Sequence, residues 1–264
     1  MVSWPVRASA RQRLAAEQGA VVKDWGGRIP TALVYPNRYY VGMSSLGFQA
    51  VYSLLNDEPD LVCERVFIES PRQARLQGLV SIESQRELWE FAVIALSLSF
   101  ELDYWNALAA LQASNIPLLS EEREDEHPLI IAGGPAVIAN PEPMAPFVDA
   151  FIIGEAETVL PRVTAALREN LERGREPLLA ALARIPGVYI PKLYSVDYNE
   201  NGTVKRIKAR EPAEMPVKRQ WVRDLDAFAT ASRVLTRDTE FGDMYLIEVA
   251  RGCSRLCRFC LAGS

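Results

Sequence analysis

The segment Leu129-Ile130-Ile131-Ala132-Gly133-Gly134-Pro135-Ala136 is an apolar run followed by two glycines and a proline. Four consecutive apolar residues are typical of a strand that is buried on both faces, and the glycines and proline mark the turn that ends it. Strands buried on both faces occur in parallel sheets that helices cover on each side. The segment therefore predicts a parallel strand of an α/β domain.

Four further apolar runs of strand length accompany this segment, and segments of helical length separate them. The expected strands are Thr31–Tyr35, Cys63–Ile68, Ala92–Leu98, Leu129–Ala132 and Ala150–Ile153. The expected helices are Ser45–Asn56, Gln85–Trp89, Asp103–Ser114, Pro143–Phe147 and Thr158–Arg173. The start of the last helix is set by Pro161, which a helix tolerates only in its first turn. This alternation predicts a flavodoxin-like (Rossmann-like), doubly wound domain with a five-stranded parallel sheet over residues 29–173.

The remaining residues divide into three regions. Residues 1–28 form an N-terminal arm with a helix expected over Ser9–Gln18. Residues 174–242 contain a helix candidate, Pro177–Ile185, and a proline-rich linker; the Asn-Gly pair within Asn199–Gly202 predicts a hairpin between them. Residues 243–264 begin with the apolar run Met244–Val249, which is expected to form a strand.

The composition is that of an ordinary globular protein, with 49% apolar and 24% charged residues in a chain of 264. Its net charge of −5 argues against a broad nucleic-acid-binding surface. Three of its four cysteines are clustered, which does not make a disulfide framework and suits a reducing cytoplasm. No apolar run is long enough to span a membrane, so we expect a cytoplasmic protein without membrane contact.

Small and polar residues follow the predicted strands. In a doubly wound sheet the binding crevice lies at the carboxyl ends of the strands, where glycines let a ligand approach the backbone closely. The candidate cofactor-binding residues at these ends are Asn37, Tyr39, Gly42, Ser97, Ser99, Gly133, Gly134, Pro135, Gly154 and Glu155. Tight turns alone would also use glycine, so the pattern leaves both explanations open.

The end of the chain carries Arg251-Gly252-Cys253-Ser254-Arg255-Leu256-Cys257-Arg258-Phe259-Cys260, with its cysteines in C-x3-C-x2-C spacing. Thiolates are suitable ligands for iron–sulfur clusters, and three of them can hold three irons of a [4Fe–4S] cube while the fourth iron stays open. Two alternatives remain. A zinc site would need a fourth ligand from His127 or Cys63, and the cysteines could also be inert.

At these residues the chain resembles the radical S-adenosylmethionine (radical SAM) superfamily, whose cluster loop carries this spacing after the first strand of a (β/α) barrel. The resemblance implies that Cys253, Cys257 and Cys260 hold the cluster and that S-adenosylmethionine chelates the open iron. It further implies an electron donor such as a flavodoxin or ferredoxin, cleavage to a 5′-deoxyadenosyl radical, and a substrate that the sequence does not identify. No catalytic side chain is assigned. Because the rest of a barrel takes on the order of 200 residues, we expect this chain to be the N-terminal part of a longer enzyme, inactive alone.

A second resemblance rests on Gly133-Gly134-Pro135, on Gly154-Glu155-Ala156-Glu157 and on the runs Val22–Leu54 and Glu240–Met244. These residues resemble the cobalamin-binding domain of an uncharacterised radical SAM family. Some cobalamin domains bind the cofactor by replacing its base with a protein histidine, which lies in an Asp-x-His-x-x-Gly sequence after the first strand. The only histidine here, His127, instead follows an acidic surface loop. Either cobalamin binds without a protein imidazole, or the domain is a scaffold. The second function class is therefore a non-catalytic scaffold module with structural zinc or inert cysteines.

Overall fold

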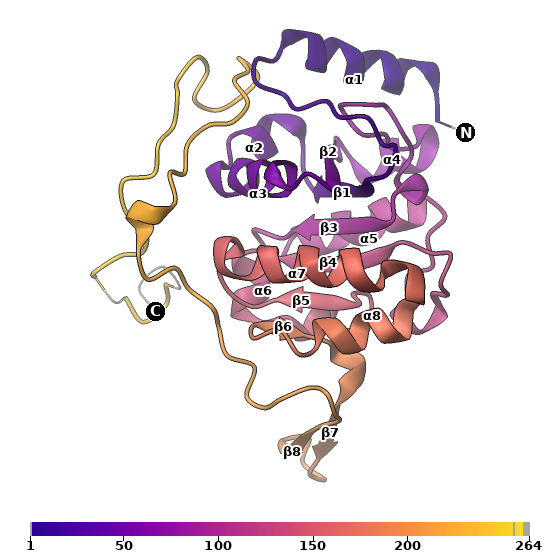
Figure 1. Ribbon diagram of the computed structural model, residues 1–264, viewed down its shortest axis with the longest axis vertical. Helices are drawn as coiled ribbons and strands as arrows, with labels where there is room; N and C mark the ends of the chain where they lie inside the picture. The colour runs from indigo at the N-terminus through magenta and orange to yellow at the C-terminus, as the bar shows by residue number, and fades with distance from the viewer. Residues whose placement is uncertain (1, 256, 261–264) are drawn as a thin grey trace.

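Five apolar runs form parallel neighbours in one sheet of the computed structural model, which describes residues 2–255 and 257–260. The strands are β1 (Ile29–Tyr35), β2 (Leu61–Phe67), β3 (Val93–Ser97), β4 (Leu129–Gly133) and β5 (Ala150–Ile152). Their order, β2-β1-β3-β4-β5, is the order of a flavodoxin-like fold (Figure 1). The predicted fold class is confirmed.

A sixth strand extends this sheet. β6 (Val188–Tyr189) pairs antiparallel with β5, and the Tyr189 ring stacks on Phe151 with the ring centroids 5.9 Å apart. Two residues are too few for the sequence to show which strand edge they join. Beyond it, β7 (Tyr194–Tyr198) and β8 (Val204–Ala209) form the predicted hairpin as a separate two-stranded sheet.

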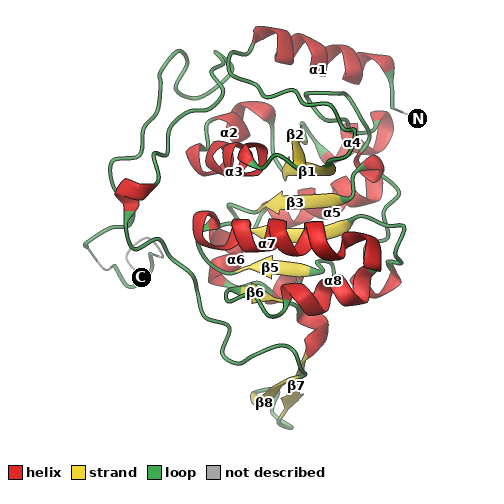
Figure 2. Cartoon of the chain, in the orientation of Figure 1, coloured by secondary structure: helices red, strands yellow, loops and turns green. Residues whose placement is uncertain are grey.

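Helices cover both faces of the six-stranded sheet (Figure 2). Alternate residues of each strand enter two different apolar clusters, as the period of two in a strand requires. One face packs against α3 (Leu46–Asp57), α7 (Ala156–Asn170) and α8 (Arg175–Leu182). The other packs against α4 (Pro71–Gln77), α5 (Asp103–Ala113) and α6 (Pro135–Ala139). The short α2 (Tyr39–Met43) follows β1. The N-terminal arm contains α1 (Trp4–Ala16), which begins five residues before the helix expected over Ser9–Gln18.

Several element predictions were wrong. The segment Gln85–Trp89 is not an α-helix: Gln85 has a φ of 57°, Glu87 makes a β-bridge to Val80, and only Leu88 and Trp89 enter a 3-10 turn, Leu88–Glu90. Pro143–Phe147 contains only the end of a single 3-10 turn, Glu142–Met144. Helix α7 begins two residues earlier than expected and therefore contains Pro161 in its interior.

The expected barrel strand at Met244–Val249 is also not formed. Its one β-bridge within the described residues joins Ile247 to Ala231, and most of its side chains are exposed. A parallel barrel strand is stabilised by strands on both sides, whereas this segment has a single extended neighbour, Thr230–Ser232, in the described part of the chain.

The edge strand β2 carries a buried charge network that attaches the N-terminal arm to the domain. The Arg65 guanidinium is bidentate to Glu17 of the arm at 2.9 and 2.6 Å and pairs with Glu83 at 2.7 Å. Tyr52 donates to Glu83 at 2.9 Å. All three charged side chains are at most 1% exposed, and burial raises the pKa of Glu83. The backbone of Arg65 also bonds to the Ile82 N–H and to the Glu83 carboxylate, so these residues cover part of the outer edge of β2 and limit its pairing with other chains.

Residues 220–251, called the strap below, run past the carboxyl ends of the strands (Figure 1). The strap starts at a parallel bridge between Gln220 and Gly154. Farther along, the Gln49 side chain accepts from the backbone N–H groups of Arg233 and Val234, both at 2.9 Å. The backbone N–H of Glu240 then donates to Ser44 Oγ at 2.8 Å. These contacts hold the strap over the side of the sheet where ligands of doubly wound folds bind.

Candidate functional site

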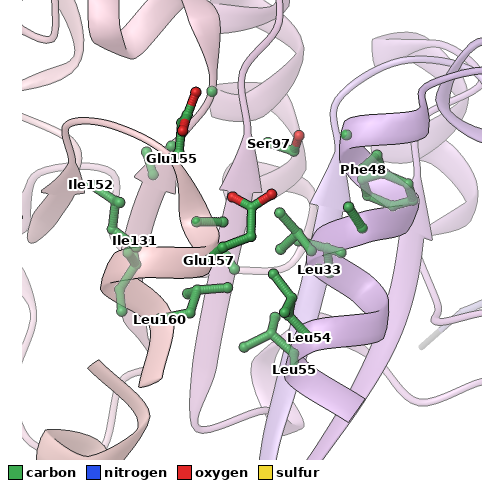
Figure 3. A pocket seen from close by; sticks show the side chains of 18 of the residues that line it. Leu33, Phe48, Leu54, Leu55, Ser97, Ile131, Ile152, Glu155, Glu157 and Leu160 are labelled. Carbon is green, nitrogen blue, oxygen red and sulfur yellow. The ribbon is translucent and has the colours of Figure 1, made fainter. Parts of the chain in front are cut away.

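A cavity of about 460 Å³ lies between the sheet, α3 and α7, and it opens at the carboxyl ends of the strands. Figure 3 shows its apolar body, with Leu33, Leu54 and Leu55 on one side and Ile131, Ile152 and Leu160 on the other. It contacts both β1 and β3, the strands at which the order of the sheet reverses. This topological switch point is the usual ligand position in the fold, and the size and lining are those of a small-molecule site.

Seven of the ten sequence-predicted cofactor-binding residues line this cavity. They are Ser97, Ser99, Gly133, Gly134, Pro135, Gly154 and Glu155. The parallel register brings them together, since the ends of β3, β4 and β5 meet at one edge of the sheet.

Two of these glycines are required by backbone packing alone. Gly134 has a φ of 112°, and a Cβ atom there would lie 2.5 Å from the Leu98 carbonyl oxygen. Gly154 has a φ of 137° and a Cβ atom there would collide with the Gln220 backbone. The alternative left open by the sequence, glycine for tight packing, accounts for both positions. Support for a ligand therefore comes from the cavity itself.

The other three predicted residues follow β1 and lie away from the cavity. Asn37 donates to Asp103 Oδ1 at 3.1 Å, and the Tyr39 hydroxyl donates to Glu17 Oε1 at 2.5 Å in the buried core. Gly42 packs against the Phe67 ring, which leaves no space for a Cβ atom. The residues that follow this loop line the cavity instead, namely Ser45, which caps α3, and the first two residues of α3, Leu46 and Gly47.

Three carboxylates and one guanidinium meet at the mouth of the cavity. Arg251 contacts Glu157 at 2.7 Å, Glu155 at 3.3 Å and Glu248 at 2.6 Å. The hydrogen bond from Arg251 lowers the pKa of Glu248, and its bonds to these carboxylates raise the pKa of Arg251. The sequence offered the Gly-Glu-x-Glu pattern and a charge beside the cysteines, but nothing in it links residues 94 positions apart.

The cysteines Cys253, Cys257 and Cys260 are exposed free thiols at the end of the described chain. A turn joins two of them, because the Cys260 N–H donates to the Cys257 carbonyl at 3.0 Å. Among residues 2–255 and 257–260, no three His, Cys, Asp or Glu side chains converge as a metal site would require. The donor set itself fits an iron–sulfur cluster, with three accessible sulfur ligands in one short loop.

The two residues considered as a fourth zinc ligand lie elsewhere. Cys63 is fully buried in β2, where burial raises the pKa of its thiol well above the ordinary value. His127 precedes β4 at the amino ends of the strands, and its Nδ1 accepts from the Glu124 N–H at 3.0 Å. The cysteine segment follows Arg251, which lies at the opposite, carboxyl ends.

Residues 47–191, more than half of the chain, match the family described as radical SAM proteins, N-terminal. The chain belongs to this family. Radical SAM proteins are an enzyme superfamily that generally uses a [4Fe–4S] cluster and S-adenosylmethionine. The matched residues of this radical SAM N-terminal chain include every residue that β4 and α7 give to the cavity wall and all those of α3 except Leu46.

An uncharacterized protein of Methanocaldococcus jannaschii is 27% identical to this radical SAM chain over 234 residues. The alignment covers 88% of the chain and 40% of the relative, so the chain spans well under half of the relative's length. No solved structure matches it. In the described part of the chain, no helix is long and apolar enough to cross a membrane.

Proposed function

We propose that this chain is the N-terminal part of a radical SAM enzyme and that Cys253, Cys257 and Cys260 hold a [4Fe–4S] cluster. The observation that carries the proposal is the loop of three exposed free thiols in a chain of the radical SAM family. None of the three is engaged in a disulfide. The positions of Cys63 and His127 count against a zinc site completed by either residue.

The bound cluster would supply the electron that cleaves S-adenosylmethionine to methionine and a 5′-deoxyadenosyl radical. That chemistry needs a low-potential electron donor, for which a flavodoxin or ferredoxin is suitable. The residues of this chain contribute the thiolates and the backbone of the loop, in which Gly252 has a φ of 86°. Glycine adopts this left-handed conformation without strain, so the chain can turn directly before the first cysteine.

Anaerobic reconstitution of the full-length protein with iron and sulfide tests the cluster. We expect about four irons per chain, as a [4Fe–4S] cube requires, and an EPR signal of the reduced cluster that changes when S-adenosylmethionine is added. Stoichiometric zinc in the protein as isolated, or iron absent after reconstitution, would contradict the proposal. A cluster whose signal ignores S-adenosylmethionine would favour the scaffold module.

The proposal extends to cobalamin as the ligand of the α/β domain. Its support is the position of the cavity at the switch point and its apolar wall, which suits the apolar arm of a larger cofactor. A protein imidazole on cobalt does not fit, because the one histidine lies at the far ends of the strands. The corrin would therefore bind without a lower ligand from this chain.

Hydroxocobalamin titration checks this second site. We expect a one-to-one complex that survives gel filtration, and we expect Leu54→Trp, which fills part of the cavity, to weaken binding at least about tenfold. Leu102→Trp is the control, because Leu102 is 81% exposed and outside the cavity wall. If wild-type protein binds no corrin, the domain is a scaffold; equal weakening by both variants would contradict binding in this cavity.

A further inference from the structure

Arg251 connects two sites that the proposed function keeps separate. It lies two residues before Cys253, and its side chain forms part of the wall of the cavity. Its partners come from different segments, since Glu155 precedes α7, Glu157 is in the first turn of α7 and Glu248 is in the strap. The guanidinium of Arg251 therefore connects the end of the strap, directly before the cysteine loop, to the α/β domain.

The surroundings of Arg251 make this contact stronger than an ordinary surface ion pair. Its side chain is 25% exposed, and those of Glu155, Glu157 and Glu248 are 19%, 7% and 21% exposed. Partial burial and hydrogen bonds between charged groups strengthen such pairs relative to fully solvated ones. Glu155 also accepts from the Val222 N–H, so the same carboxylate holds both the beginning and the end of the strap.

We propose that Arg251 is a positioning residue that fixes the cysteine loop against the mouth of the cavity and couples the two sites. The inference rests on the proposed cluster at the three cysteines. A molecule that enters the cavity and donates hydrogen bonds to Glu155 or Glu157 competes with Arg251 for the same carboxylate oxygens. Occupancy of the cavity then changes the position and the electrostatic surroundings of the loop.

Hydrogen exchange in the full-length protein without iron tests the tether. The reporter amides are Leu246, which donates to Ser232 Oγ at 3.0 Å, and Glu248, which donates to the Thr230 carbonyl at 2.9 Å. We expect Arg251→Gln to speed their exchange about tenfold, because the strap loses its charged contact with α7. Arg237→Gln is the matched control: Arg237 pairs with Asp243 in the same strap but is 88% exposed, so we expect no change.

The reduction potential of the reconstituted cluster tests the coupling. Loss of the positive charge in Arg251→Gln should lower the potential, loss of a negative charge in Glu157→Gln should raise it, and Arg251→Lys should stay near the wild type. A purely structural tether would shift the two glutamine variants in the same direction.

Unchanged exchange in Arg251→Gln, or potentials that shift together, would overturn the inference. If wild-type protein takes up no iron, the proposed function fails. The exchange rates of the iron-free protein still decide whether Arg251 holds the loop.

Discussion

Replacing Arg65 by methionine is expected to lower the free energy of unfolding by about 3–5 kcal/mol, because it leaves two carboxylates buried without their counter-ion. Glu17 and Glu83 both have at most 1% of their side chain exposed, and Arg65 donates to both. Burial already raises the pKa of Glu83, so the site tolerates its charge only beside the guanidinium. Urea denaturation at neutral pH, followed by circular dichroism, measures the change.

Two further variants show whether the loss of stability comes from the buried carboxylates or would follow the loss of any arginine side chain. Arg168→Met removes pairs with Glu58 and Asp60 on the surface, where the Arg168 side chain is 44% exposed, and should cost less than about 1 kcal/mol. Glu83→Gln removes one of the two buried negative charges while Arg65 keeps Glu17, so it should cost less than Arg65→Met. If the free energy of unfolding of Arg65→Met lies within about 1 kcal/mol of the wild-type value, the network does not hold the arm.

The sequence predicted the sheet well because its strands are buried on both faces. Runs such as Leu129–Ala132 are uniformly apolar, and that pattern has few structural alternatives when helices separate the runs. The helices were less certain. Gln85–Trp89 has helical composition, but Gln85 is left-handed, Glu87 bridges to Val80, and Gln85 accepts hydrogen bonds from Arg7 and Arg11 of the N-terminal arm. Tertiary contacts of this kind leave no local signal.

The candidate site was predictable to the extent that the sheet was. Parallel strands place their carboxyl ends together, so residues such as Ser97, Gly133 and Glu155 meet without further information. The loop after β1 is the exception. Its Tyr39 points into the core and donates to Glu17 of the N-terminal arm, and the sequence did not show how that arm packs. The ion pair of Arg251 with Glu157 was missed for the same reason. It depends on the strap, which returns to α7 from far along the chain.

Substituting any one of the three clustered cysteines by alanine is expected to reduce reconstituted iron from about four per chain to less than about one, since two thiolates do not retain the cube. Cys257→Ala is the most direct test, because Cys257 is the middle cysteine of the C-x3-C-x2-C pattern. The measurement is iron per chain, with absorption in the blue-violet region as a second readout.

Cys63→Ala provides the matched control, because it removes the fourth cysteine without touching the loop. Cys63 is fully buried in β2, and the raised pKa of its thiol disfavours the thiolate that a metal ligand must be. We therefore expect Cys63→Ala to keep its full complement of iron. Full iron in Cys257→Ala would show that the spacing is not the ligand set, and parallel loss in Cys63→Ala would show that iron retention reports only the stability of the fold.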